Sequence, residues 1–121
     1  GNDVNRLLNI KTLYLDGLRS MEMLFWFLQR TPNLENMFLV RCFNKEILSG
    51  GSHVAHKKIG TAVHLRTLRL RYFPVQNISF LNHPIIQRVE QLYLVGCSGL
   101  ITLFPSLISF SHLTYLEVSR C

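Results

Sequence analysis

Three cysteines and five histidines are the residues of this 121-residue chain that could bind a metal or act as nucleophiles. The thiols belong to Cys42, Cys97 and Cys121, which lie far apart in the sequence. A zinc site needs several ligands at short, regular spacing, and an odd number of distant cysteines is not a disulfide framework. The cysteines therefore predict no structural metal, and they favour a reducing, cytoplasmic location.

The histidines and carboxylates form no recognisable catalytic set. His53 and His56, with His64 further along, have the spacing of metal ligands, but glycine and serine flank the pair and a solvated loop is the favoured interpretation. The seven acidic residues fall at no spacing that pairs two carboxylates for acid–base chemistry. No GxxxxGK[ST] loop is present to hold a phosphate. We predict no catalytic, cofactor-binding or metal-binding residue and no small-molecule substrate, so the chain is not expected to be an enzyme.

Composition restricts the remaining classes of protein. Apolar residues make up 48% and charged residues 17% of the chain, which predicts a folded domain rather than a disordered one. The net charge of +6 permits acidic partners or nucleic acid without requiring either. Because no aromatic and basic RNA-binding motif accompanies it, nucleic-acid binding is not favoured. The apolar run from Met23 to Leu28 is far shorter than the roughly 20 residues of a membrane span.

One apolar template recurs five times and accounts for the positions of the cysteines. Each copy has apolar residues at its first, fourth and sixth positions and a small or apolar residue at its ninth. The copies start at Ile10, Leu34, Leu65, Val89 and Leu113, with spacings of 24, 31, 24 and 24 residues. This period is typical of leucine-rich repeats. All three cysteines occupy the ninth position, where a small polar group would meet the backbone of a turn.

The template predicts short strands, because residues two apart in a strand point to the same face. The expected strands lie near 10–16, 34–40, 65–71, 89–95 and 113–119, and the long spacing indicates a loop insertion at 49–60. One turn cannot bury its apolar side alone, so successive turns must stack. We predict an α/β fold over 1–121: a leucine-rich-repeat solenoid with a curved parallel sheet inside and short helices or irregular segments outside.

The return from the first strand to the second is expected to be a helix. A helical spacing relates Leu18, Met21, Leu24, Phe25 and Leu28, and Pro32 should end that pattern. Trp26 lies between these positions, and we expect it to pack on the outer side of the solenoid rather than serve as a ligand platform.

Residues that point outward from the predicted strands form three columns. The first column is Thr12, Asn36, Thr67, Gln91 and Tyr115, and the third is Asp16, Val40, Arg71, Val95 and Ser119. The middle column carries three aromatic residues and an arginine, which are the types that most often anchor protein interfaces. The alternative is that these aromatics only support the sheet. We predict that the concave, partner-binding face consists of Tyr14, Phe38, Arg69, Arg71, Tyr93 and Glu117.

The amino-acid sequence of the repeats resembles that of a known family. The segment LITLFPSLISFSHLTYLEVSRC at 100–121 is similar to the C-terminal repeats of plant NB-LRR (nucleotide-binding, leucine-rich-repeat) disease-resistance proteins of the coiled-coil class. The same family's repeats also resemble the segments TPNLENMFLVRCFNKEIL and IKTLYLDGL. Phe73 and Leu18 depart from the pattern, since each stands where a cysteine would be expected.

The resemblance implies the recognition region of an intracellular plant immune receptor. Such repeats hold the receptor's nucleotide switch inactive and help to sense a pathogen effector or a guarded host protein. The chain lacks an initiating Met, and we expect it to be a fragment, so any nucleotide would be bound by a domain outside it. The alternative is the substrate-binding part of an F-box ubiquitin-ligase adaptor. Those repeats usually follow the cysteine with an Asp-containing turn, whereas Cys97 is followed by Ser98-Gly99-Leu100-Ile101-Thr102.

Overall fold

The computed structural model describes residues 6–43, 64–73, 79–99 and 107–121, and the predicted insertion at 49–60 lies outside these residues. In chain order the elements are β1 (Thr12–Asp16), α1 (Met21–Arg30), β2 (Asn36–Val40), β3 (Thr67–Arg71), η3 (Ser79–Asn82), α3 (Pro84–Gln87), β4 (Gln91–Val95) and β5 (Tyr115–Ser119). Each strand falls within one of the five ranges that the template predicts.

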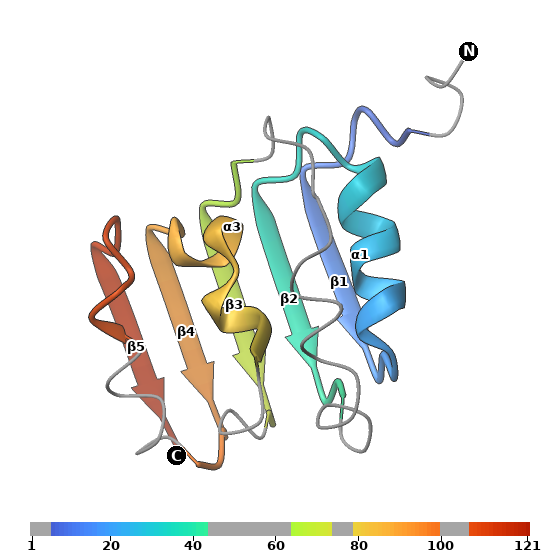
Figure 1. The fold of residues 1–121 in the computed structure, drawn as a ribbon. Coiled ribbons are helices and arrows are strands. Elements are labelled where there is room, and N and C mark those ends of the chain that lie inside the picture. The colour runs from blue at the N-terminus through green and yellow to red at the C-terminus, as the bar shows by residue number, and fades with distance from the viewer. Residues whose placement is uncertain (1–5, 44–63, 74–78, 100–106) are drawn as a thin grey trace.

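The five strands form one parallel sheet in the order β1-β2-β3-β4-β5, so each strand pairs with the next one along the chain. The register keeps equivalent template positions side by side, as in the row Leu13, Met37, Leu68, Leu92 and Leu116. Figure 1 shows β1 and β5 at the two edges of the sheet, with α1 and α3 on the same face. The fold is thus a parallel, α/β-like arrangement with few helices in the described residues.

A left-handed residue follows each strand and turns the chain away from the sheet. These residues have φ between 49° and 74°, and they are Gly17, Arg41, Tyr72, Gly96 and Arg120. The first four extend the ladder by one hydrogen bond, since each backbone N–H donates to the last carbonyl of the next strand at 2.9–3.0 Å. Because glycine, arginine and tyrosine share no side-chain property, the apolar template did not reveal this position.

The core lies between the sheet and the helices, and its side chains are most completely buried in the central strands. The inward residues of β2, β3 and β4 are fully buried, whereas Leu13 and Leu15 of β1 are half-buried. Leu116 of β5 lies in the same row but is 43% exposed. It belongs to an edge strand, where no further strand among the described residues packs on its open side. Burial therefore follows position in the stack rather than residue type.

Helix α1 confirms the predicted return segment. Its N-terminus is capped by Ser20, whose Oγ accepts a hydrogen bond from the Met23 backbone N–H at 3.3 Å. Met21, Leu24, Phe25 and Leu28 are buried against the sheet, as the 3.6-residue period requires. The helix ends at Arg30, two residues before Pro32.

Helix α3 and the 3-10 helix η3 were not predicted from the sequence. His83 caps α3 through Nδ1, which accepts a hydrogen bond from the Ile85 N–H at 3.2 Å. Pro84 follows at the first helical position, where its missing N–H costs nothing. Ile85 and Ile86 are buried in the core. The helix is a single turn, too short for a hydrophobic period to show in the sequence.

The three cysteines make equivalent contacts, which confirms the structural interpretation of their shared position. Each Sγ lies 3.3–3.7 Å from two carbonyl oxygens, one at the end of its own strand and one on the preceding strand. The preceding-strand acceptors are Leu15 for Cys42, Leu70 for Cys97 and Leu94 for Cys121. The thiols therefore bind backbone carbonyls at the turns, and all three are free.

Burial should make the thiols differ in reactivity. Loss of hydration raises the pKa of the Cys97 thiol to about 11 and also raises the pKa of Cys42, so neither forms appreciable reactive thiolate near pH 8. Cys121 is exposed. We expect iodoacetamide to modify Cys121 in the native protein and to reach Cys42 and Cys97 only after denaturation. Peptide mass spectrometry measures this directly, and rapid native labelling of Cys97 would contradict it.

Phe73 stands at the cysteine position of the third repeat and fills the interior there. Its side chain is 1% exposed, and its ring packs edge-on against Phe43 with centroids 5.6 Å apart. The following turn is kept, because the Ser98 N–H donates to the Phe73 carbonyl at 3.1 Å. This departure from the repeat pattern thus replaces a thiol–carbonyl contact with an aromatic pair.

Candidate functional site

The face of the sheet opposite the helices carries a continuous stack of rings and one guanidinium. Tyr14 is 61% exposed, and its ring centroid lies 5.8 Å from that of Phe38. The Cζ of Arg69 lies 5.0 Å from the Phe38 centroid and 3.9 Å from that of Tyr93. Tyr93 in turn lies 5.2 Å from Tyr115. We call these five residues the aromatic ladder.

Tyr115 is a member of the aromatic ladder that the sequence analysis missed. It belongs to the first outward column, beside Gln91, whereas Tyr93 pairs with Glu117 in the strand register. The Tyr115 ring nevertheless reaches Tyr93 across columns, and its hydroxyl donates to Glu117 Oε1 at 3.3 Å. The negative charge of Glu117 raises the pKa of Tyr115, which keeps that hydroxyl protonated. Diagonal neighbours on adjacent strands lie within reach of aromatic side chains.

The aromatic ladder also contributes to the stability of the sheet. Each ring pair adds about 0.5–1.5 kcal/mol beyond area burial, and each exposed cation–π contact adds about 0.5–1 kcal/mol. The supporting role and the binding role of these residues are therefore compatible. A binding face differs from a purely supporting one because some of its side-chain groups are not already used in contacts within the protein.

All six residues predicted for partner binding line one hollow of about 160 Å³ on this face. They are Tyr14, Phe38, Arg69, Arg71, Tyr93 and Glu117, and the floor is completed by Val40, Leu70 and Val95. Pockets for small ligands are usually about 300–1,000 Å³. A hollow of this size, on a sheet face bordered by rings, fits one or two side chains of a protein partner.

Two residues expected to point into solvent are buried. Val40 is 6% and Thr67 is 7% exposed. Thr67 Oγ1 donates to Gln91 Oε1 at 3.0 Å, and Val40 is a small residue among larger side chains in the floor of the hollow. The alternation of faces predicted their direction correctly, but the size of neighbouring side chains decided their exposure.

An ion pair between Asp16 and Arg41 lies at the β1 edge of this face. The guanidinium of Arg41 donates to both carboxylate oxygens of Asp16, with Nε–Oδ1 at 3.2 Å and Nη2–Oδ2 at 2.7 Å. Arg41 can reach Asp16 because its left-handed backbone turns the side chain back toward the preceding strand. The hydrogen bonds from Arg41 lower the pKa of Asp16.

This pair predicts a specific titration. Because Arg41 stabilises the charged carboxylate, the Asp16 pKa should lie below its ordinary value of 3.8, and in Arg41→Gln it should move upward toward that value. The stabilising contact is present above the unfolded-state pKa and is lost as the pH falls through the lower, folded-state pKa. Carboxyl ¹³C NMR of Asp16 in both proteins measures the shift, and identical titration curves would contradict it.

The other acidic residues near the sheet also have partners. Glu35 Oε2 accepts from Lys11 Nζ at 3.2 Å, and Glu90 Oε2 lies 3.3 Å from His64 Nε2. His64 was considered above as a metal ligand, and in the structure it faces one carboxylate. His53 and His56 lie outside the described residues. The charges at the strand N-termini thus pair between neighbouring repeats.

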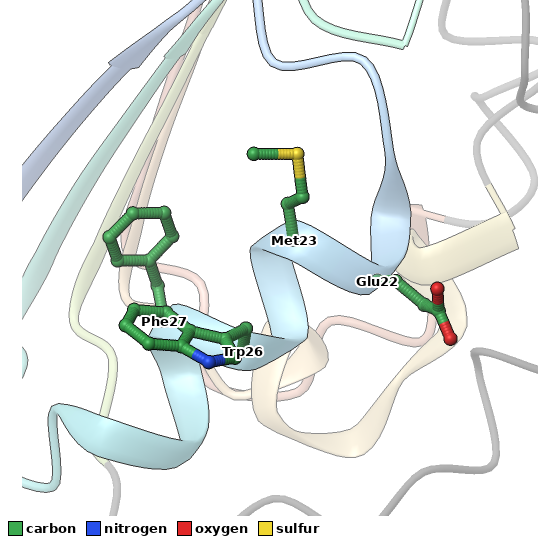
Figure 2. Close-up of a pocket in the computed structure, with 4 residues that line it drawn as sticks. All are labelled: Glu22, Met23, Trp26 and Phe27. Atoms are coloured by element: carbon green, nitrogen blue, oxygen red, sulfur yellow. The ribbon is translucent and has the colours of Figure 1, made fainter. Parts of the chain in front are cut away.

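A second, larger hollow of about 560 Å³ lies on the outer side of α1. Among the described residues it is lined by Glu22, Met23, Trp26 and Phe27, whose side chains spread from the helix in Figure 2. Trp26 is 48% exposed, and its ring packs edge-on against Phe27 at 5.1 Å. Its position on the outer side was predicted correctly, and the guanidinium of Arg30 lies over the indole, with Cζ 4.1 Å from the ring centroid.

Within 6–43, 64–73, 79–99 and 107–121 no three His, Cys, Asp or Glu side chains come together as metal ligands. No helix within those ranges has the length and apolar character needed to cross a membrane.

Comparison with protein-family models, with curated proteins and with solved structures gives no match in any of the three. Function must therefore be argued from the repeated sequence pattern, the parallel sheet and the geometry of its open face.

Proposed function

We propose that the chain is a non-enzymatic protein-recognition module, a leucine-rich-repeat solenoid from a cytoplasmic plant immune receptor. In this role its open sheet face contacts a pathogen effector, a guarded host protein or the receptor's own nucleotide-binding domain, and it helps to hold the nucleotide switch inactive. The chain itself would need no cofactor. The immune part of the proposal rests on the resemblance to plant NB-LRR repeats.

The single observation that supports recognition best is the gathering of all six predicted residues around one hollow. Five strands from five repeats place five of them side by side, and Arg71 lies two residues after Arg69 on β3. Tyrosine and arginine contribute large contact areas at interfaces, and the hollow is small for a metabolite. The repeated turns, each with a left-handed residue after its strand, support the solenoid.

Determining the coding sequence upstream of this chain in its parent transcript tests the immune assignment. The proposal expects a nucleotide-binding domain preceded by a coiled coil. An F-box in that place would replace the proposal with the ubiquitin-ligase alternative. The absence of an Asp-containing turn after Cys97 favours the immune receptor, and either upstream domain settles the choice.

Charge reversal in the aromatic ladder tests the binding face. Arg69→Glu removes the guanidinium from between two rings and places a negative charge there, so we expect affinity for the nucleotide-binding domain of the same receptor to fall about tenfold or more. Titration calorimetry measures affinity, and circular dichroism checks that the fold is kept. Arg19→Glu provides a charge-matched control, because Arg19 is exposed outside the sheet. Equal affinity of wild type and folded Arg69→Glu would contradict the proposal.

A further inference from the structure

Arg69 is held in a way that leaves its hydrogen-bond donors available. The Cζ of its guanidinium lies over the rings of Phe38 and Tyr93, at 5.0 and 3.9 Å from their centroids. The five N–H donors of a guanidinium lie in its plane around that carbon, so contacts between the carbon and the rings do not use them. A group restrained in this way loses less conformational entropy when it binds a ligand.

Arg71 lies two residues further along β3 and lines the same hollow. The carboxylates of the sheet and its edges are already engaged by other residues: Asp16 by Arg41, Glu35 by Lys11, Glu90 by His64 and Glu117 by Tyr115. Among the described residues neither Arg69 nor Arg71 has an ion pair. Among the described residues the hollow therefore contains two guanidinium groups without an ion-pair partner and one carboxylate, that of Glu117, which leaves an excess of positive charge.

The spacing of these two charges indicates the shape of a ligand. Residues two apart on a parallel strand lie about 6.6 Å apart and point to the same face. An extended peptide has the same spacing between its alternate side chains. Carboxylates at alternate positions would therefore meet Arg69 and Arg71 together, each in the charge-assisted geometry that a guanidinium favours. The residues between them would point away from the sheet.

We propose that the hollow binds an acidic, extended segment of a protein partner, with alternate carboxylates paired to Arg69 and Arg71. This deepens the recognition function proposed above and rests on it. Tyr14 and Phe38 extend the contact surface toward β1. Glu117 lies on β5, two strands from β3, and also lines the hollow, so its negative charge opposes carboxylates placed on that side of the hollow.

Fluorescence anisotropy with the 121-residue chain tests this proposal. The probe is a short fluorescein-labelled peptide in which glutamate alternates with serine. We expect Arg69→Gln and Arg71→Gln each to weaken its binding about tenfold. The matched control is Arg88→Gln, because Arg88 is exposed at the end of α3, which packs on the other face. Glu117→Gln should strengthen binding. Circular dichroism confirms that each variant is folded.

Two further probes decide between specific and general charge effects. A peptide with glutamates three residues apart places successive carboxylates on opposite faces of an extended chain and should bind more weakly. A single-stranded oligonucleotide tests nucleic acid as the ligand. Equal loss of binding in Arg88→Gln, equal binding of both peptides, or tighter and Arg69-dependent binding of the oligonucleotide would each overturn the proposal. None of these results affects the transcript test, so a failure of the acidic-segment proposal can be told apart from a failure of the immune assignment.

Discussion

Replacing Phe73 with alanine is expected to lower the free energy of unfolding by about 3–5 kcal/mol. The ring is fully buried and contacts Phe43 edge-on, and Phe73 comes two residues after the central strand β3. Its removal loses the transfer free energy of the ring and leaves a cavity that a stacked sheet cannot close. Domains of this size are usually stable by only about 5–15 kcal/mol, so much of the native population could be lost.

Chemical denaturation followed by circular dichroism measures this effect, with two variants for comparison. Tyr14→Ala removes an aromatic ring of similar size from the exposed end of the aromatic ladder, and we expect a loss of about 1 kcal/mol or less. Phe73→Leu keeps most of the volume and should fall between the two. A Phe73→Ala protein as stable as Tyr14→Ala would show that Phe73 is not part of the core.

Gly96→Ala is expected to destabilise the protein by about 2 kcal/mol, and Gly17→Ala by about 1 kcal/mol. Both glycines have a left-handed backbone, with φ of +63° and +74°. A Cβ at Gly17 meets no atom within 4 Å, whereas one at Gly96 would lie 2.7 Å from Cδ1 and 2.9 Å from Cε1 of Tyr72. The backbone cost is shared, so the difference between the variants measures the contact with the tyrosine ring.

A double-mutant cycle separates the two costs at Gly96. In a Tyr72→Ala background the added methyl has free space, and Gly96→Ala should then cost about as much as Gly17→Ala, a coupling of about 1 kcal/mol. Urea denaturation of the four proteins provides the values. Additive effects of the two substitutions would indicate that the half-exposed Tyr72 ring moves aside without cost.

The strands could be located from the sequence because their signal is local and repeated. Leu13, Met37 and Leu68 belong to copies of one template, and the shared register of the sheet follows from their equivalent positions. The cysteines were interpreted correctly for the same reason, since residues at equivalent template positions meet equivalent backbone atoms. A single short apolar segment would be ambiguous between strand and helix, whereas five copies of one template indicate a strand.

Features that depend on neighbouring side chains could not be predicted in this way. Tyr115 joined the aromatic ladder across columns because a tyrosine ring reaches further than the strand register suggests. Val40 and Thr67 became buried on the open face through the size and hydrogen bonding of their neighbours. The ion pair between Asp16 and Arg41 required a left-handed backbone at arginine, for which the residue type gives no signal.

The order of the strands, their direction and the face that each leucine takes were determined by the sequence alone, because apolar periodicity acts through the backbone geometry of every repeat. Tertiary structure decided the chemistry of the open face. Whether a guanidinium such as that of Arg69 is neutralised by a carboxylate or held between two rings depends on side chains from three strands, which are brought together only when the repeats stack.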